Sequence, residues 1–296
     1  MESPAYSSIE SSCRDGDLPS VKSLLPSLRQ QSTDLNADMK SLLMTACQHA
    51  EADIASYLLT QGAEWDHYLP IMIGRRAKSN QYIPIFQLFL DHGWDINTDH
   101  HGFGTALLNL ALVLYLLANG ADANMEAFQP GAKTRMMHSL PGRAHGMMPL
   151  DSAASRGCVE VIRVLLDHGA RLEGANPLHK AAAEPCASEA EDIARIQTME
   201  FLITEKGMDI NALQSFTPGS SAIPSDGRPA IMATPLHYAA RWQNQSRVKF
   251  LLEHGADPTK QASDGGTPLE WAITMNDEET GGLDPEIETL LREASN

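Results

Sequence analysis

The sequence has 296 residues, with 22 basic and 38 acidic side chains, so its formal net charge is −16 at pH 7. This negative field repels nucleic acid, and we do not expect a nucleic-acid partner. Hydrophobic residues make up 43% and charged residues 20% of the chain, a balance typical of folded proteins that excludes disorder of the whole chain.

The chain shows no signal for secretion or for a membrane span. Residues 1–12 are polar and contain no basic region followed by an apolar run. The longest apolar stretch, residues 106–118, is interrupted by Asn109 and is shorter than the roughly 20 residues that cross a bilayer. The cysteines form no CxxC pair, and we expect free thiols in a reducing compartment. These features predict a cytoplasmic or nuclear protein with no membrane partner.

Short apolar segments followed by a glycine recur along the chain. The spacing of their apolar residues predicts amphipathic helices, and each glycine can adopt a positive φ and end its helix. The segments are residues 54–59, 85–90, 113–117, 161–166, 199–203 and 248–252, and the glycines are Gly62, Gly93, Gly120, Gly169, Gly207 and Gly255.

A second signature precedes several of these helices. Proline stands at Pro149, Pro177, Pro235 and Pro268, and the last two follow a threonine. Threonine caps a helix and proline fits its first turn, so each position predicts a helix start. Alanine pairs follow at residues 153–154, 181–182 and 239–240, where small side chains let antiparallel helices approach closely. The predicted unit is therefore helix, tight turn, helix and glycine stop.

This order of features resembles the ankyrin repeat, with its TPLH helix start, paired alanines and GAD finger. The resemblance is fullest at Thr234–Pro258 and extends over residues 9–292. It implies an all-α solenoid of stacked helix-turn-helix units with finger hairpins, whose first helices and fingers line a concave, partner-binding surface. Such a resemblance identifies a fold and not a function.

We expect a single solenoid domain over residues 1–296. It consists of an N-terminal capping unit at 1–39, central repeats at 40–260 and a C-terminal capping repeat at 261–296. Residues 125–147 and 212–232 are predicted inserts that enlarge two fingers, and residues 184–192 are predicted to lengthen a turn between two helices. The interval from Gly93 to Gly120 is shorter than the family period of about 33 residues, so residues 109–118 form either one distorted helix or a truncated pair.

Three aromatic residues near the C-terminus are candidate binding residues. Tyr238 follows the TPLH motif, Trp242 lies four residues further on, and Trp271 takes the position of Tyr238 in the next repeat. They would form one patch on the concave side, where Tyr and Trp are favoured interface anchors. The alternative is that the rings pack against the insert at 212–232.

The insert at residues 125–147 reverses the sign of the chain's charge, because it has three basic side chains against the single acid Glu126. Its candidate binding residues are Lys133, Arg135, His138, Arg143 and His145. They could receive an acidic segment or an anionic small molecule, with arginine making bidentate contacts. The alternative is a disordered loop that tolerates basic residues.

The sequence carries no conventional catalytic or metal-binding motif. There is no GxSxG, HExxH or GxxxxGK sequence, so we expect no enzyme activity of a known type, no cofactor and no catalytic residue. The small residues Cys13 and Cys47 occupy alanine positions of their repeats and are expected in the core. Cys158 lies in a predicted turn, with nothing nearby that would lower its pKa.

The histidines are expected to have structural roles. His92, His168 and His254 each precede a stop glycine, where an imidazole suits a helix C-terminus. His179 and His237 stand in the helix-start motif, where the resemblance implies hydrogen bonds to neighbouring loops. No fixed spacing completes a zinc site, and no metal is predicted.

The leading hypothesis is a protein-protein interaction scaffold or adaptor that binds a partner protein on its concave face. The alternative is an ankyrin fold recruited as a small-molecule-binding protein or unconventional enzyme, with a pocket closed by the two inserts. An enclosed cavity between the inserts and the three aromatic residues would favour the alternative, and an open groove would favour a protein partner.

Overall fold

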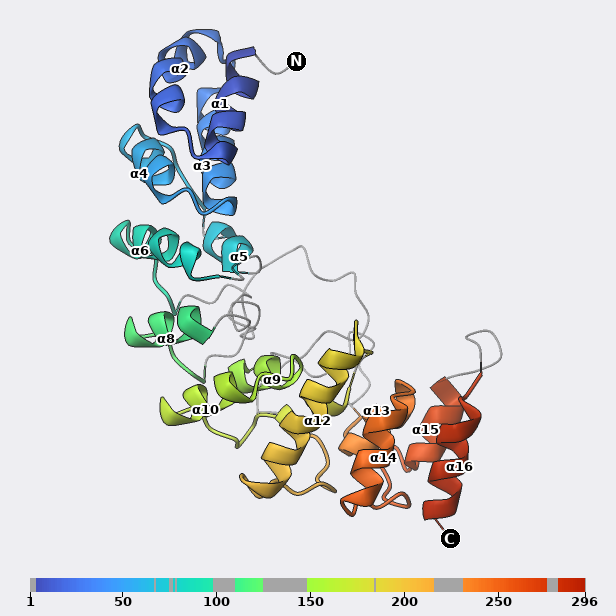
Figure 1. The fold of residues 1–296 in the computed structure, drawn as a ribbon. Coiled ribbons are helices and arrows are strands. Elements are labelled where there is room, and N and C mark those ends of the chain that lie inside the picture. Colours follow the sequence, from blue (N-terminus) through green and yellow to red (C-terminus); the bar gives the residue numbers. More distant parts are fainter. Residues whose placement is uncertain are drawn as a thin grey trace. The chain divides into compact units, whose positions relative to one another are not determined.

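The computed structural model describes residues 4–66, 68–74, 77, 79–97, 110–124, 148–183, 185–215, 231–275 and 282–295 (Figure 1). Over these ranges the regular secondary structure is helical and includes no β-strand, which confirms the all-α prediction. Within the same ranges, no helix has the length and apolar character required to cross a membrane. The chain divides into two compact units, Met1–Ala121 and Asp122–Asn296.

In its described residues, the first unit consists of helical pairs and one further helix. Its elements are α1 (Pro4–Asp15), α2 (Leu18–Gln31), α3 (Leu35–Gln48), α4 (Ala52–Thr60), α5 (Tyr68–Gly74), η1 (Asn80–Tyr82), α6 (Ile83–Asp91) and α8 (Leu110–Ala118). The first helices α1, α3 and α5 contact each other in sequence, and so do the second helices α2, α4 and α6. This is the stacking expected of a repeat protein.

One boundary predicted for the first unit differs from the structure, and one choice stays open. The predicted boundary between residues 39 and 40 falls inside α3, because the carboxylate of Asp34 accepts the backbone N–H of Ala37 at 3.1 Å and starts the helix at Leu35. The first helical pair therefore ends at Gln31. The choice between a distorted helix and a truncated pair stays open, because residue 109 lies outside the described residues and α8 is described from Leu110.

The described part of the second unit repeats the same plan with four helical pairs. Its helices are α9 (Pro149–Ala154), α10 (Val159–Asp167), α11 (Pro177–Ala182), α12 (Glu189–Thr204), α13 (Pro235–Arg241), α14 (Gln245–Glu253), α15 (Pro268–Met275) and α16 (Pro285–Ala294). The first helices α9, α11, α13 and α15 contact one another in order, as do the second helices α10, α12, α14 and α16. The three alanine pairs are fully buried where these helices meet.

The predicted helix stops are confirmed by the backbone. All six stop glycines have a positive φ, between 65° at Gly207 and 91° at Gly62. The histidines before three of these glycines place Nδ1 2.7–2.8 Å from the carbonyl oxygen four residues earlier, so the imidazole satisfies an acceptor at the helix end.

The motif histidines bond neighbouring loops, as the resemblance implied. His237 Nε2 donates to the carbonyl oxygen of Gly266 at 3.0 Å, and its Nδ1 lies 2.8 Å from the hydroxyl of Thr234. His179 Nε2 donates to the carbonyl oxygen of Ala212 at 3.0 Å. Because Nε2 faces a carbonyl oxygen in both residues, Nε2 carries the proton of the neutral ring.

The two predicted inserts are described only in part. Residues 125–147 lie outside the described residues, and with them Lys133, Arg135, His138, Arg143 and His145. Of the second insert, the ends are described: the backbone N–H of Gln214 donates to Ala233 at 2.9 Å, and Met232 and Ser263 bond each other twice. The enlargement of the two fingers therefore stays a prediction.

The connection between α11 and α12 is longer than those after α9 and α13, in line with the lengthened turn predicted at residues 184–192, but residues 189–192 belong to a helix and not to the turn. Helix α12 begins at Glu189, well before the predicted apolar segment at 199–203. The hydroxyl of Ser188 accepts the backbone N–H of Glu191 at 3.3 Å, and the carboxylate of Glu191 accepts the N–H of Ala187 at 3.0 Å. This arrangement closely resembles a capping box, which starts the helix four residues after the turn's proline, Pro185.

Candidate functional site

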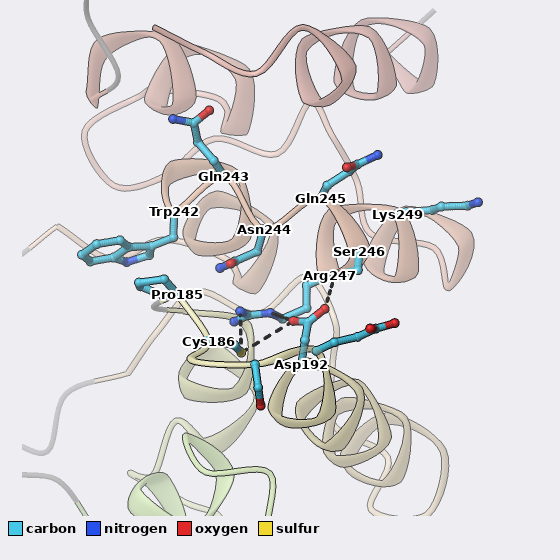
Figure 2. Close-up of a pocket in the computed structure, with 12 residues that line it drawn as sticks. Pro185, Cys186, Asp192, Trp242, Gln243, Asn244, Gln245, Ser246, Arg247 and Lys249 are labelled. Carbon is cyan, nitrogen blue, oxygen red and sulfur yellow. Dashed lines mark hydrogen bonds and ion pairs between the residues drawn. The ribbon is translucent and has the colours of Figure 1, made fainter. Parts of the chain in front are cut away.

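A groove in the second unit lies where the start of α12 meets the end of α13 and the start of α14. It has a volume of about 650 Å³ and is open to solvent. Figure 2 shows its lining, which includes Pro185, Glu189, Trp242, Asn244, Gln245 and Lys249. The lining thus combines an aromatic ring and a proline with amide groups and with acidic and basic side chains.

Trp242 is the main apolar group of this groove. It is the residue that follows the end of α13, and 42% of its surface is exposed. The guanidinium of Arg241 lies 5.7 Å from the centre of its ring, within the range of a cation–π contact. Pro185 and Trp242 line the same end of the groove (Figure 2).

The other two predicted aromatic residues lie together. The rings of Tyr238 and Trp271 meet edge to face, with their centres 6.0 Å apart and an interplanar angle of 81°. Trp271 is only 5% exposed, packs with Ala233 and Ala262, and donates from Nε1 to the carboxylate of Asp264 at 3.2–3.3 Å. Trp271 therefore stabilises the fold and offers no free surface.

Tyr238 is tied to the described base of the second insert. Its hydroxyl donates to the side-chain oxygen of Gln214, and its ring meets the ring of His179 at 6.1 Å. Burial raises the pKa of the Tyr238 hydroxyl to about 12. These contacts are those that the packing alternative predicts, so Trp242 is the exposed ring of the predicted patch.

Arg247 forms the floor of the groove. Its side chain is fully buried, and its Nε donates to Oδ1 of Asp192 at 2.8 Å. Its Nη1 donates to the carbonyl oxygens of residues 181, 182 and 183 at 2.8–3.1 Å, and its Nη2 donates to Sγ of Cys186 at 3.2 Å. One side chain of α14 thereby caps the C-terminus of α11 and binds the turn that follows (Figure 2).

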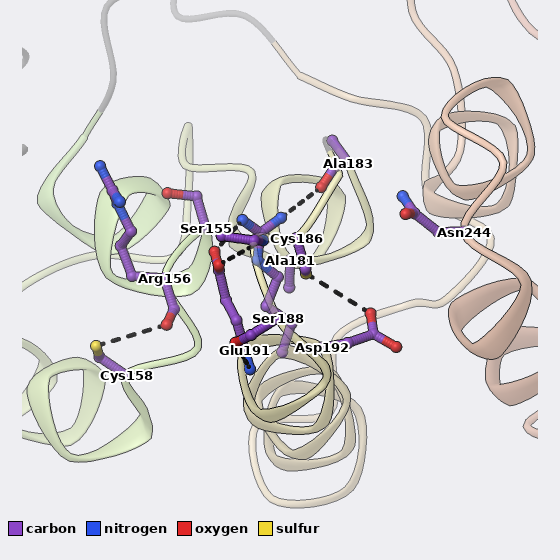
Figure 3. Close-up of polar contacts among 12 residues, drawn as sticks. Ser155, Arg156, Cys158, Ala181, Ala183, Cys186, Ser188, Glu191, Asp192 and Asn244 are labelled. Carbon is purple, nitrogen blue, oxygen red and sulfur yellow. Dashed lines mark hydrogen bonds and ion pairs between the residues drawn. The ribbon is translucent and has the colours of Figure 1, made fainter.

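A second buried arginine supports the same turn from within α12. Arg195 donates from Nη1 to the carbonyl oxygen of Ala183 and from Nη2 to the carboxylate of Glu191, both at 2.7 Å (Figure 3). The pKa of Glu191 is held below its ordinary value, first by the N–H of Ala187 and then by Arg195. Asp192 also accepts the hydroxyl of Ser246, so α12 and α14 are bridged twice.

The arginine of this network keeps a fixed charge, and the thiol of the network is not activated for reaction. Burial lowers the pKa of Arg247, but a guanidinium remains charged in proteins. Burial also raises the pKa of the Cys186 thiol, although Arg247 and Arg195 act in the opposite direction. Cys13 and Cys47 are buried, with pKa values raised to about 12. In the described ranges, no group of His, Cys, Asp or Glu side chains could hold a metal ion.

Arg247 was missed from the sequence, although a signal for it exists. It lies eight residues before Gly255, and the residues eight before four other stop glycines are aliphatic and buried: Ile54, Ile85, Leu112 and Val161. A charged residue at this apolar register position indicates a buried polar partner. The partner itself, Asp192, is distant in sequence and could not be identified.

Comparison with known proteins gives matches to one family. Residues 219–281 match the family described as ankyrin repeats (3 copies), and residues 145–173 match the family described as ankyrin repeat.

Three curated relatives are similar to parts of the chain. "Ankyrin repeat and SOCS box protein 11" of Danio rerio is 33% identical over 122 residues, 41% of this chain and 34% of the relative. "Putative E3 ubiquitin-protein ligase XBAT35" of Arabidopsis thaliana is 36% identical over 123 residues, 40% of this chain and 22% of the relative. "Putative ankyrin repeat protein FPV230" of Fowlpox virus (strain NVSL) is 46% identical over 41 residues, 14% of this chain and 22% of the relative. The matches span about a third or less of each relative.

Proposed function

Because the chain belongs to the ankyrin-repeat family, we propose that it is a scaffold that binds a partner protein and that the groove around Trp242 is one of its contact surfaces. The repeats and the relatives support a protein-interaction role in general. The location of the contact on this chain is our own proposal, as is its action in the cytoplasm or nucleus, which rests on the unpaired cysteines.

The exposed indole of Trp242 carries this proposal. Tryptophan side chains bury about 150–250 Å² when fully covered. Covering the exposed 42% of Trp242 would remove roughly 60–100 Å² from water, which stabilises a complex by about 2 kcal/mol at 25 cal/mol per Å². That is the size of an interface hot spot.

The shape and chemistry of the groove favour a polypeptide. Small molecules are usually held in clefts that bury 70–90% or more of their surface, whereas this groove is open. The side chains of Asn244 and Gln245 lie at its wall (Figure 2), and amides can bond the backbone of an extended segment. The space between the two inserts lies outside the described residues, so no observation favours the small-molecule alternative.

The test begins with the full chain as bait, and mass spectrometry identifies the captured protein. The dissociation constant of the purified pair is then measured for the parent, Trp242→Ala and the matched control Ile273→Ala, an apolar side chain that is 46% exposed outside the groove. We expect Trp242→Ala to weaken binding by about 30-fold, which corresponds to about 2 kcal/mol. Equal affinities of the three folded proteins would refute the groove as a contact surface.

The basic insert is a second proposed contact, which acts on the rate of association. Changing Arg135 and Arg143 to glutamate should slow association with an acidic partner at low salt and have little effect at high salt, because exposed charges act through a screened field. Trp242→Ala should instead increase the rate of dissociation. Rates at two ionic strengths separate the two contributions.

A further inference from the structure

The turn between α11 and α12 is longer than the turns after α9 and α13. It connects Ala182 to Glu189, whereas the turns after α9 and α13 are only a few residues long. Because α11 is short, the carbonyl groups at its C-terminus have few helical partners and need donors from elsewhere. An aliphatic residue at the register position of Arg247 could not provide them.

Arg247 supplies those donors to one continuous stretch of chain. Its acceptors are three carbonyl oxygens of residues 181–183, Sγ of Cys186 and Oδ1 of Asp192. The residues between these contacts include Pro185 and Ser188, which form one wall of the groove. The buried side chain of Arg247 and its ionic partner Asp192 therefore attach the wall to α14 (Figure 2), and Ser246 adds a hydrogen bond to Asp192.

We propose that Arg247 and Asp192 form a latch that holds residues 183 and 185–189 against α14 and thereby sets the shape of the groove. The opposite side of the groove, formed by Trp242 and the turn after α13, has further contacts of its own. Gln243 there donates to the carbonyl oxygen of Gly282 at 3.2 Å and accepts the N–H of Asp284 at 2.7 Å. Release of the latch should loosen one wall and leave the other in place.

The value of the latch for binding rests on the proposed function, but the latch itself can be tested without a partner. Hydrogen exchange is measured on the full chain for the parent, Asp192→Asn and Arg247→Ile. The second variant restores the type of side chain found at Ile54 and Ile85, so the core is expected to remain filled. The control is Arg292→Gln, which removes an exposed ion pair with Glu288.

We expect amides of residues 183–192 to exchange about tenfold faster or more in both latch variants, whereas those of residues 199–204 and 245–253 keep the parent rate. The control should match the parent throughout. Unchanged exchange at residues 183–192 in both variants would overturn the proposal, and so would an equal acceleration across α12 and α14, because that would indicate general loosening of the repeats.

Cys186 provides a second readout at the latch itself. In a Cys158→Ser background, Cys186 is the partly exposed thiol, since Cys13 and Cys47 are buried. The rate of its alkylation by iodoacetamide is measured as a function of pH. The midpoint of this curve gives the pKa of the thiol, and the plateau at high pH gives the limiting rate of the thiolate. The limiting rate should rise about tenfold in Asp192→Asn; a limiting rate within twofold of the parent would contradict the latch. The affinity of the latch variants for the partner is then compared with that of Trp242→Ala. This comparison distinguishes failure of the latch from failure of the binding groove.

Discussion

The side chain of Asn124 bonds the next finger of the second unit: its Nδ2 donates to the carbonyl oxygen of Gly169 at 2.9 Å. Its Oδ1 accepts the backbone N–H of Arg171 at 2.8 Å. The predicted insert at residues 125–147 lies between these partners in sequence. Because one amide supplies both a donor and an acceptor, it fixes the register of the flanking fingers across the insert.

Asn211 makes the same pair of contacts across the second predicted insert. It donates to the carbonyl oxygen of Gly255 at 3.2 Å and accepts the N–H of Asp257 at 2.7 Å. The same asparagine contact with the finger of the following repeat therefore occurs twice within the second unit.

We predict that Asn124→Ala and Asn211→Ala each lower the free energy of unfolding by about 1–3 kcal/mol, because each removes two hydrogen bonds worth about 0.5–1.5 kcal/mol. Urea unfolding followed by circular dichroism measures the change. The control is Asn119→Ala, whose amide donates to the carbonyl oxygen of Tyr115 in the preceding helix α8. A loss no larger than that of the control would show that the finger contacts do not fix the register.

The second helices should be sensitive to truncation at the positions that the repeat pattern places in the core. Leu165 and Leu251 are 2% and 0% exposed. Leu165→Ala and Leu251→Ala should each cost about 2–5 kcal/mol, through lost apolar transfer and the cavity that remains. The matched control is Leu114→Ala, at a leucine that is 41% exposed. Unfolding curves of the two core variants that overlay the parent would refute the repeat register.

The helix ends were predictable because their signals are local. A glycine that ends a helix or a proline that starts one acts on its own backbone, so Gly169 and Pro235 could be interpreted without knowledge of the rest of the fold. The start of α12 was missed because its apolar pattern is inverted: Ile193 is 49% exposed, whereas Arg195 is 4% exposed. The Ser188–Glu191 pair was the available signal.

The aromatic residues show where residue spacing stops being informative. The shared register of Tyr238 and Trp271 predicted neighbours, and their ring centres lie 6.0 Å apart. The spacing of four residues placed Trp242 on the helix face of Tyr238, but α13 ends at Arg241, and Gln243 takes a left-handed φ of 53°. Burial of Trp271 depends on Ala262 from a neighbouring finger, which no local pattern specifies.

The turns between paired helices contain a left-handed position, where glycine is favoured. Gly16 and Gly157 have φ of 76° and 71°, but Ala50 takes φ of 64° in the corresponding turn after α3. A left-handed alanine costs about 1–2 kcal/mol, and the added chain entropy of glycine offsets about 0.5–1 kcal/mol of that. Ala50→Gly should therefore stabilise the protein by up to about 1 kcal/mol in urea unfolding.

The converse substitution is Gly157→Ala. A Cβ there would lie 2.7 Å from the backbone carbon and from the Cβ of Ala194, in addition to the strained φ. We expect a loss of about 2–5 kcal/mol from strain and overpacking together. If neither substitution changes the free energy of unfolding by more than the experimental error, the left-handed strain is absent in solution.

Acid should destabilise the second unit through His179. The ring is buried, and desolvation lowers its pKa from 6.5 to about 4. Because the unfolded chain binds the proton more readily, stability is full above the unfolded pKa and falls as pH drops from about 6.5 towards 4. One such group lowers the free energy of unfolding by about 2 kcal/mol between pH 7 and pH 5. The pKa of His237 is also lowered by burial, so it acts in the same direction.

The variant His179→Gln isolates this contribution, because an amide can still donate to Ala212 but does not titrate. We expect it to be less stable than the parent at pH 7, because it fits the buried site less well, and to lose about 2 kcal/mol less between pH 7 and pH 5. Urea unfolding at both pH values measures the difference. The lower limit of pH 5 avoids protonation of carboxylates such as Glu191, whose pKa is below its ordinary value. Parallel loss of stability in parent and variant would mean that His179 is not held neutral by its burial in the folded protein.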